Sequence, residues 1–376
     1  MNSLNYRFDD KRAFYRAKPP QTERKPLNPA SNHENTRTIT ISNSGKTFAA
    51  RPDETVLAAA LRQGIMLPYS CRNGTCASCK CRLVSGSVEY PYNPPAALEE
   101  ADLVEGRMLA CQAVAAGDLE IEATEIEQVA DIPVRVLPAR VEQIDELTPD
   151  VRRLRLKLPR GKRMQFLAGQ YMDILLPGGK RRAFSIASSP SQEEFIELHV
   201  RFVEGGGFTG HVFDGMQPGE ILRLEGPLGM FFVRLNSPRP ILMMGGGTGF
   251  APLKAMIEDL LHAGDARPIT LYWGVRTEKD LYAKGLIEEF ADRHPDFHFV
   301  PVLSEAEPDW TGRAGFVHSA LLADYPELSA FEIYMSGPPA MVHAARKEFL
   351  AHGGSEQHLH YDSFDFAPDV PPADMG

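Results

Sequence analysis

The sequence predicts a multidomain protein that combines α/β and all-β folds. Three observations support this: a cysteine-rich loop within a short mixed α/β stretch, a central run of short alternating strands, and a C-terminal alternation of strands and helices. At 376 residues the chain is long enough for two or three domains. Its 43% hydrophobic and 24% charged residues are typical of a globular protein that forms its cores without disulfides.

The charge and hydropathy of the chain exclude two classes of function. Because the formal net charge is −10, whereas binding to nucleic-acid phosphates needs clustered Lys and Arg, we expect no nucleic-acid partner. An acidic surface suits a protein partner with a basic face. No apolar run approaches the roughly 20 residues of a membrane span, and residues 1–20 lack the apolar core of a signal peptide. We therefore expect a soluble, cytoplasmic protein.

Residues 1–36 are polar, with more Lys and Arg than Asp and Glu and no sustained apolar period. This composition predicts a disordered or loosely docked tail, which is either a basic docking segment for a partner or a variable extension. Residues 367–376 are predicted to form a flexible C-terminal tail.

The first predicted domain spans residues 37–128. Alternating apolar and polar residues around a Ser-Gly turn predict a β-hairpin over 38–50. A helix should follow, with Asp53 as its N-cap and Gly64 as its stop. The cysteine loop, a strand over 81–90 and a strand pair within 108–123 complete this domain.

Four of the five cysteines define the chemistry of this domain. Cys71, Cys76 and Cys79 have the spacing C-x4-C-x2-C, and Cys111 follows in LACQ, which is the plant-type [2Fe-2S] pattern. Small residues between them let the backbone direct N–H groups at sulfur. Zinc is the alternative metal, but a zinc ribbon needs a second C-x2-C, which the sequence lacks. Cys81 is expected to face the core as a small hydrophobic residue rather than act as a ligand.

Residues 134–236 contain short alternating runs separated by Gly and Pro turns, which predict an antiparallel barrel or sandwich. Within them lies the sequence Arg182-Ala183-Phe184-Ser185. An arginine can neutralise the pyrophosphate of FAD, an aromatic ring can pack on the flavin, and a hydroxyl can hydrogen-bond its N5. The alternative for this motif alone is an exposed strand with its arginine in solvent.

Two glycine-containing segments support the flavin interpretation. Gly205 to Gly207 and Thr209 precede a predicted helix, where free backbone amides bind phosphate, so Gly207 and Thr209 are candidate cofactor-binding residues. The GPLG sequence at 226–229 is predicted to form the turn that closes the barrel.

Residues 237–366 alternate between apolar strands and helical segments, which predicts a doubly wound parallel sheet. MMGGGTGFAPL runs strand, glycine loop, helix, the context that a dinucleotide site requires. It is not a strict G-x-G-x-x-G and it lacks the G-K-[S/T] of a P-loop, which excludes an ATPase; a purely structural turn is the alternative. The candidate nucleotide-binding residues are Gly246, Gly247, Thr248 and Gly249, joined by Ser336, Gly337 and Pro338 of the SGPP turn at the sheet's carboxyl edge.

Arg276 follows the strand ITLYWG and should lie near the adenosine ribose of the nucleotide. It could pair with a 2′-phosphate, but no second basic residue stands beside it before Lys279. We therefore predict NADH as the preferred nucleotide, with NADPH possible.

The motifs CRNGTCASC, LACQ, RAFS, GGGTGFAP and SGPP occur in this order, so the sequence resembles the ferredoxin-NADP⁺ reductase superfamily over about residues 37–366. Within it, the sequence is similar to oxygenase reductases with an N-terminal plant-type ferredoxin domain and to their relative CDP-6-deoxy-Δ3,4-glucoseen reductase. The resemblance implies a β-grasp ferredoxin domain, an antiparallel FAD barrel and a doubly wound NAD(P)H domain. It also implies Cys71, Cys76, Cys79 and Cys111 as cluster ligands and places Arg182, Phe184 and Ser185 in the flavin motif.

The resemblance also suggests catalytic residues. Ser185 is the first candidate catalytic residue. Ser336 is the second, and it stands where many relatives have Cys. This difference bears on the rate of hydride transfer more than on the function. Phe364, in HYDSFDF, is expected to pack on the flavin and to yield to nicotinamide, as an aromatic residue near the C-terminus does in many relatives. Tyr361 and Phe366 are alternative candidates, and ordinary core packing of Phe364 is the structural alternative.

The chemistry implied is an electron relay. Nicotinamides deliver two electrons as hydride and a [2Fe-2S] cluster accepts one, so a flavin must stand between them. The external acceptor would be a protein: an oxygenase or hydroxylase component or, alternatively, an iron-sulfur dehydrase of deoxysugar synthesis. A non-enzyme alternative is a ferredoxin-like carrier whose C-terminal domains are only structural.

Overall fold

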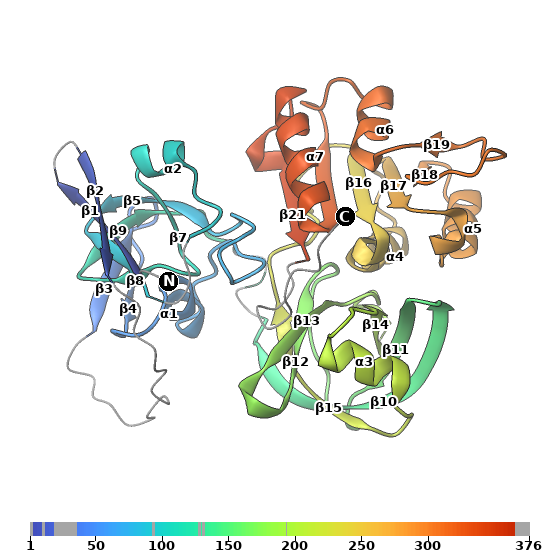
Figure 1. The fold of residues 1–376 in the computed structure, drawn as a ribbon, viewed down its shortest axis with the longest axis horizontal. Coiled ribbons are helices and arrows are strands. Elements are labelled where there is room, and N and C mark those ends of the chain that lie inside the picture. The colour runs from blue at the N-terminus through green and yellow to red at the C-terminus, as the bar shows by residue number, and fades with distance from the viewer. Residues whose placement is uncertain are drawn as a thin grey trace. The chain divides into compact units, whose positions relative to one another are not determined.

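The chain forms two compact units, Met1–Asp131 and Ile132–Gly376 (Figure 1). The computed structural model describes residues 3–9, 12–18, 36–91, 95–126, 129, 132–192 and 194–364. The predicted C-terminal tail, 367–376, therefore lies outside the described residues, as does Phe366. Within the described part of the chain, no helix combines the length and apolarity needed to cross a bilayer.

The first unit contains a five-stranded sheet in the order β4-β3-β9-β5-β7, with helix α1 (Val56–Arg62) beside it. Strand β3 pairs antiparallel with β4 and parallel with β9, which is the β-grasp arrangement that the sequence predicted. Its strands are β3 (Arg37–Ile41), β4 (Thr47–Ala50), β5 (Lys80–Ser85), β7 (Arg107–Leu109) and β9 (Leu119–Glu122).

Helix α1 begins two residues later than the sequence indicated. Thr55, not Asp53, is the N-cap, because its hydroxyl oxygen accepts a hydrogen bond from the N–H of Ala58 at 3.2 Å. Gly64 follows the helix with φ of 74°, a left-handed conformation that favours glycine, so the predicted stop is confirmed.

A second, four-stranded sheet of the first unit has the order β2-β1-β6-β8. Its strands are β1 (Ser3–Asp9), β2 (Arg12–Lys18), β6 (Ser87–Tyr90) and β8 (Val114–Ala115), and a short helix, α2 (Glu100–Val104), lies between β6 and β7 in the chain. The segment predicted as a loose tail thus contributes two strands, of which β1 pairs with β6.

The second unit opens with a six-stranded antiparallel sheet in the order β13-β12-β15-β10-β11-β14. Its elements are β10 (Arg135–Thr148), β11 (Val151–Lys157), β12 (Tyr171–Leu175), β13 (Arg181–Ser185), β14 (Ile196–Arg201), α3 (Gly207–Asp214) and β15 (Ile221–Leu228). A single bridge between Ile186 and Leu198 joins its two edges, so in the described residues no full ladder closes the predicted barrel. Gly226 to Leu228 belong to β15, so the prediction of a closing turn there was wrong.

The C-terminal part of the second unit is a parallel sheet in the order β19-β18-β17-β16-β20-β21, which confirms the doubly wound prediction. Ile241 and Met243 of β16 pack on the core beneath α4, whereas Leu242 and Met244 pack on the core beneath α6 and α7. Both faces of the sheet are thus covered, which explains the continuous apolar strands. The elements are β16 (Ile241–Gly246), α4 (Phe250–Ala263), β17 (Ile269–Val275), α5 (Lys284–Arg293), β18 (Phe297–Leu303), β19 (Arg313–Ala314), α6 (Val317–Asp324), β20 (Glu332–Gly337), α7 (Pro339–Ala351) and β21 (Leu359–Ser363).

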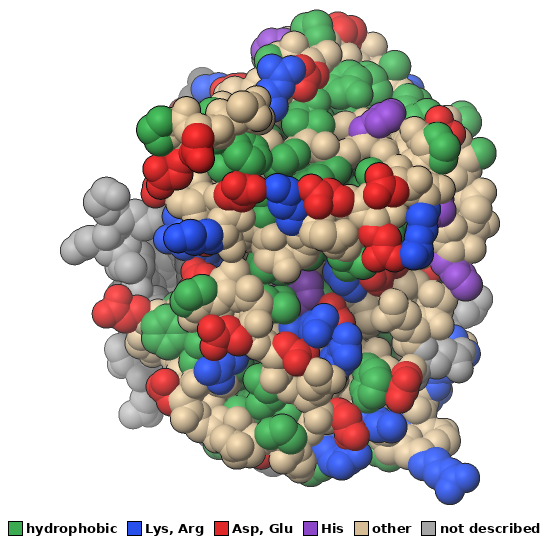
Figure 2. Space-filling view, turned by 90° about the vertical axis from the view of Figure 1, so that its right-hand side faces the viewer, with side chains coloured by type: hydrophobic (Ala, Val, Ile, Leu, Met, Phe, Trp, Pro, Cys, Tyr) green, Lys and Arg blue, Asp and Glu red, His purple; other side chains and the backbone are tan. Residues whose placement is uncertain are grey.

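Short 3₁₀ turns add to these elements at η3 (Pro177–Gly179), η4 (Gly247–Gly249), η5 (Glu278–Asp280) and η6 (Glu356–His358). Figure 2 looks onto the side that carries α5, β18 and β11 in Figure 1, and acidic and basic side chains are interspersed over it. Lys284, at the start of α5, pairs with Glu278 at 2.7 Å.

Candidate active site and metal centre

The cysteine thiols of the first unit approach one another in two pairs. The N–H of Cys71 donates to Sγ of Cys76, and the N–H of Cys76 donates to Sγ of Cys71, both at 3.4 Å. The Cys71 and Cys76 side chains hydrogen-bond each other, as do those of Cys79 and Cys111. Two pairs of thiols are the donor set that a two-iron cluster needs, so the residues present fit a [2Fe-2S] cluster.

The loop that carries these thiols adopts a conformation that side chains rarely tolerate. Arg72 and Ala77 have φ of 59° and 62°, and Gly74 has φ of 91°. Non-glycine residues persist in this region mainly where the surrounding structure or a ligand requires it. Gln112, which the sequence did not single out, donates from its amide to the carbonyl oxygen of Arg72 at 2.7 Å and contacts Sγ of Cys111 at 3.7 Å. Such contacts to sulfur tune the reduction potential of a cluster.

The thiols of the first unit differ in pKa: hydrogen bonding to the partner thiol and burial raise the pKa of Cys76 and of Cys79 well above the usual range. Hydrogen bonding with Cys76 lowers the pKa of Cys71 to about 5, so this pair readily supplies a thiolate. Burial raises the pKa of Cys81 to about 12, and its side chain is buried as predicted for a core residue. Among the residues that the structure describes, no three His, Cys, Asp or Glu side chains converge on a single metal position.

The flavin motif lies on β13, an edge strand paired with β12. Because side chains alternate along a strand, Arg182 and Phe184 share one face, and Ala183 and Ser185 the other. The ring of Phe184 packs against that of Phe208 in α3, with 5.5 Å between ring centroids. This contact brings the RAFS strand next to the glycine-rich start of α3.

The start of α3 is shaped by Thr209. Its hydroxyl lies 3.1 Å from the carbonyl oxygen of Gly206 and accepts a hydrogen bond from the N–H of Val203 at 3.2 Å. The hydroxyl is therefore already bonded within the loop, and its contribution is to hold the loop's shape. The space where a Cβ would stand at Gly207 is open, which suits a phosphate approaching the helix amides.

The predicted catalytic serines meet at the carboxyl edge of the parallel sheet. Ser185, 9% exposed, donates from its hydroxyl to the carboxylate of Asp362, which is 6% exposed, at 3.3 Å. In the sheet, Asp362 of β21 is the register partner of Ser336 in β20. The N–H of Phe364 donates to the carbonyl oxygen of Gly337 at 3.0 Å. Ser185 thus contacts Asp362, Ser336 stands beside Asp362 on the neighbouring strand, and the backbone of Phe364 follows directly after β21.

Two buried hydroxyls at this edge lack a partner. Among the described residues, Oγ of Ser336 and Oγ of Ser363 make no hydrogen bond, although Ser336 is fully buried. An unsatisfied buried hydroxyl is costly unless a ligand bonds to it. This edge therefore fits a polar ligand such as a nicotinamide or flavin ring.

The glycine loop packs directly on the SGPP turn. A Cβ at Gly249 would stand 2.1 Å from the carbonyl oxygen of Ser336, and one at Gly246 would stand 3.1 Å from Cδ of Pro338. Only glycine permits this approach, which places Gly247, Thr248 and Gly249 (η4) beside β20. The indole N–H of Trp273 donates to the carbonyl oxygen of Gly247 at 2.9 Å and fixes the loop from β17.

A buried polar network joins the flavin sheet to the nucleotide sheet. The ammonium of Lys254 in α4 lies 3.3 Å from Glu197, 2.8 Å from Glu258 and 3.0 Å from the carbonyl oxygen of Ala187, just beyond the RAFS motif. His199 contacts Glu197 through Nε2 and the hydroxyl of Tyr282 through Nδ1, both at 3.0 Å. The network therefore fixes the flavin motif relative to the nucleotide-binding helix.

This network predicts sensitivity of the second unit to acid. Burial lowers the pKa of His199 below 6.5. Burial alone would raise the pKa of Glu197, but the hydrogen bond from His199 and the charge of Lys254 lower it to about 2. As the pH falls below 6.5, His199 binds a proton in the unfolded chain but not yet in the folded chain, so the free energy of unfolding decreases. Below pH 4.5 the same difference at Glu197 decreases the free energy of unfolding further. The contribution of this network to the free energy of unfolding is therefore greatest at neutral pH and decreases as the pH is lowered.

We expect the free energy of unfolding to fall by up to about 1.4 kcal/mol per pH unit below pH 6.5 from His199 alone. Denaturant unfolding followed by flavin fluorescence between pH 7.5 and 5.5 measures it. His199→Gln should flatten this dependence, whereas His211→Gln, at an exposed histidine, should not. Equal slopes in all three proteins would contradict the assignment.

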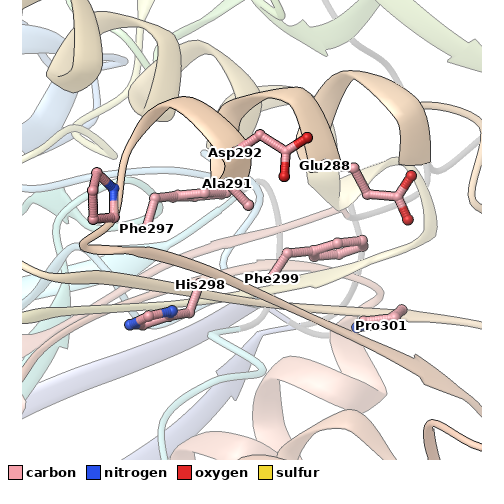
Figure 3. A pocket seen from close by; sticks show the side chains of 8 residues that line it. Glu288, Ala291, Asp292, Phe297, His298, Phe299 and Pro301 are labelled. Atoms are coloured by element: carbon pink, nitrogen blue, oxygen red, sulfur yellow. The ribbon is translucent and has the colours of Figure 1, made fainter.

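A surface pocket of about 390 Å³ lies between α5 and β18, where Figure 3 shows the carboxylates of Glu288 and Asp292 projecting from the helix above Phe297 and Phe299. It shares no residue with the flavin, nucleotide or cysteine motifs, and we assign it no role.

Arg182 offers a direct test of the flavin motif. Removing its guanidinium in Arg182→Ala should weaken FAD retention about tenfold to a hundredfold, because a charge-assisted contact to the pyrophosphate is lost. Flavin content after exhaustive dialysis measures this. Arg181→Ala, which removes the exposed neighbour paired with Glu225, is the matched control. Unchanged occupancy in Arg182→Ala would refute the proposed contact.

Three families of protein domains match the chain. They are the 2Fe-2S iron-sulfur cluster binding domain over residues 39–116, the oxidoreductase FAD-binding domain over 138–233 and the oxidoreductase NAD-binding domain over 243–347. These matches confirm the predicted [2Fe-2S], FAD and NAD cofactors. The exact domain boundaries and the individual site residues stay predictions.

Relatives match over nearly their whole length. The CDP-6-deoxy-L-threo-D-glycero-4-hexulose-3-dehydrase reductase of Yersinia pestis is 40% identical over 87% of this chain and 98% of that protein. The reductase component DmpP of phenol 2-monooxygenase from a Pseudomonas species is 41% identical over 82% of this chain and 88% of that protein. The crystal structure of the Amycolatopsis reductase GcoB covers 88% of this chain and 99% of its own, with 36% identity and a TM-score of 0.74.

Fold, thiol pairs and relatives together define an NAD(P)H-dependent iron–sulfur flavoprotein oxidoreductase. The chain belongs to the ferredoxin-NADP⁺ reductase superfamily, among the reductases whose plant-type ferredoxin domain precedes the flavin domain. It passes electrons from NAD(P)H through FAD and the [2Fe-2S] cluster to an acceptor, so the passive-carrier alternative is set aside.

Proposed function

We propose that this reductase serves a separate oxygenase or hydroxylase component, with NADH as its donor and a protein as its electron acceptor. The observation that carries the proposal is the 41% identity to the reductase component of phenol 2-monooxygenase over 88% of that protein. Reductase components of phenol 2-monooxygenase and of terephthalate 1,2-dioxygenase are among the similar proteins. The acidic net charge of −10 suits a basic docking face on that partner.

The roles of the chain's own residues follow from their positions. The flavin supplies the change from two-electron to one-electron transfer when bound. Ser185 holds a hydroxyl at the flavin motif, and Asp362 fixes the direction of that hydroxyl. Ser336 has a buried, unbonded hydroxyl that would be available to a nicotinamide, and Phe364 would be the aromatic residue that covers a bound flavin.

A second candidate acceptor is an iron–sulfur dehydrase of deoxysugar synthesis. The observation in its favour is the 40% identity to the Yersinia dehydrase reductase over 98% of that protein. Either acceptor would be met in the cytoplasm, where reduced nicotinamide and reduced thiols are available; we propose that location for the protein.

Reconstitution distinguishes the two acceptors. The purified holoprotein with NADH would be mixed anaerobically with the oxidised oxygenase component of a phenol monooxygenase, or with the hexulose dehydrase, and acceptor reduction followed by stopped-flow absorbance. We expect at least about tenfold faster reduction of the oxygenase component. Faster reduction of the dehydrase would reverse the assignment, and reduction of neither would refute both.

We also predict a preference for NADH over NADPH. Arg276, the basic residue at the end of β17, is already paired with two carboxylates, Asp150 and Asp280, each at 3.5 Å. It is therefore poorly placed to compensate an added 2′-phosphate. Steady-state cytochrome c reduction should give the higher kcat/KM with NADH, and a higher value with NADPH would contradict the prediction.

A further inference from the structure

A carboxylate of the flavin sheet reaches across to the nucleotide sheet. Asp150, in the turn between β10 and β11, receives Nη2 of Arg201 at 2.9 Å and its Nε at 3.1 Å. The same oxygen lies 3.5 Å from Nη2 of Arg276, and the hydroxyl of Thr148 donates to the other oxygen at 2.8 Å. Asp150 is thus fixed between two guanidinium groups that come from different sheets.

Both arginines lie where a dinucleotide would bind. Arg276 follows β17, the second strand of the nucleotide sheet, and the residues after this strand recognise the 2′-position of the adenosine ribose in dinucleotide-binding folds. Arg201 ends β14, and its Nη1 lies 3.0 Å from the position that a Cβ on Gly247 would take. Asp150 therefore connects Arg201, beside the glycine loop, with Arg276, at the ribose end of the site.

The charges at the ribose end are unfavourable for a phosphate. The guanidinium of Arg276 pairs with Asp150 and Asp280, and Asp150 also pairs with Arg201, so the two positive charges of this cluster are already balanced by two carboxylates. Burial would raise the pKa of Asp150, but the Thr148 hydroxyl and the charge of Arg201 outweigh it and lower the pKa, so this carboxylate is ionised at neutral pH. A ribose hydroxyl can donate to a carboxylate, whereas a 2′-phosphate would be repelled by both.

We propose that Asp150 is a specificity-determining residue, contributed by the flavin sheet, that favours NADH by holding Arg276 and repelling a 2′-phosphate. The inference rests on the proposed nicotinamide reductase function and adds a determinant outside the nucleotide domain. Asp280 acts with it from the nucleotide side. Removal of the Asp150 charge frees Arg276 to bind the phosphate.

The test uses nucleotide fragments, so that binding is measured without turnover. Dissociation constants of 5′-AMP and 2′,5′-ADP would be determined calorimetrically for the flavin-loaded wild type and for Asp150→Asn. We expect the ratio of the two constants to shift about tenfold toward 2′,5′-ADP in the variant. Adding Arg276→Ala to Asp150→Asn should abolish the gain, because the released guanidinium is what binds the phosphate.

The matched control is Asp145→Asn. Asp145 lies on β10, the strand that leads into the turn of Asp150, and pairs with Arg153 at 2.8 Å, which makes it a carboxylate of the same kind in a pair unconnected with Arg276. An unchanged ratio in Asp150→Asn, an equal shift in Asp145→Asn, or a gain that survives Arg276→Ala would each overturn the proposal. Flavin reduction of the wild type by NADH in the same preparation reports separately on the proposed function, so the two failures are distinguishable.

Discussion

Cys76→Ser is expected to yield a folded flavoprotein without its iron–sulfur cluster. The side chain of Cys76 forms one of the two thiol pairs with Cys71, and its backbone N–H donates to the partner sulfur. Serine cannot replace thiolate as a ligand of comparable softness, so one iron loses its second sulfur donor and the cluster is lost. The flavin motif lies in the other compact unit, so FAD should remain.

The measurement is iron and sulfide content per FAD, together with the visible spectrum. Wild type should contain one [2Fe-2S] cluster and one FAD per chain, and replacement of Cys71, Cys79 or Cys111 by serine should have the same effect as Cys76→Ser. Cys81→Ser is the control, because Cys81 is buried on strand β5 and belongs to neither thiol pair, so it is expected to bind no iron. Zinc in place of iron, or cluster loss in Cys81→Ser alone, would contradict the ligand assignment.

The second large effect is expected at the serine–aspartate pair. Asp362→Ala should lower the rate of flavin reduction by NADH about a hundredfold while FAD stays bound. The reason is that the Ser185 hydroxyl loses the buried carboxylate that orients it, and a misoriented group beside the reacting ring costs the alignment that hydride transfer requires. Ser185→Ala should have a similar effect.

Stopped-flow absorbance under anaerobic conditions measures this rate. If the two residues act as one unit, the double variant should be little slower than either single variant. Ser191 is an exposed serine in the loop that follows the motif, and in Ser191→Ala the flavin should be reduced at the wild-type rate. A folded Asp362→Ala protein with unchanged reduction rate would show that the pair only packs the sheet edge.

Much of the fold could be predicted because its signals are local. The strands over 241–246 and 269–275 are apolar throughout, since helices cover both faces of their sheet. The hairpin over 38–50 has an alternating pattern that one buried face imposes. The errors arose where neighbouring residues compete: Asp53 and Thr55 are both good N-caps, and only the geometry of the helix start chooses Thr55.

The candidate site was only partly predictable for a physical reason. Cysteine spacing and glycine loops are contiguous in sequence, so Cys71 to Cys79 and Gly246 to Gly249 could be named at once. Asp362 stands 177 residues from Ser185, and no local pattern connects them. Asp150 pairs with Arg201 of its own sheet but reaches Arg276 only after two sheets pack, and ion pairs of this kind have no signature in the sequence. For Asp362, the available signal was its position in HYDSFDF, two residues before the predicted Phe364.

Anaerobic titration of the purified holoprotein with NADH tests whether electrons pass from the nucleotide through the flavin to the iron–sulfur cluster. Visible absorbance would follow the flavin, and electron paramagnetic resonance would count the reduced cluster. We expect NADH alone to reduce both centres, with one FAD and one [2Fe-2S] cluster per chain, and Cys76→Ser to retain reduction of the flavin only. A cluster that stays oxidised while the flavin is fully reduced, or a chain that binds no flavin, would contradict it.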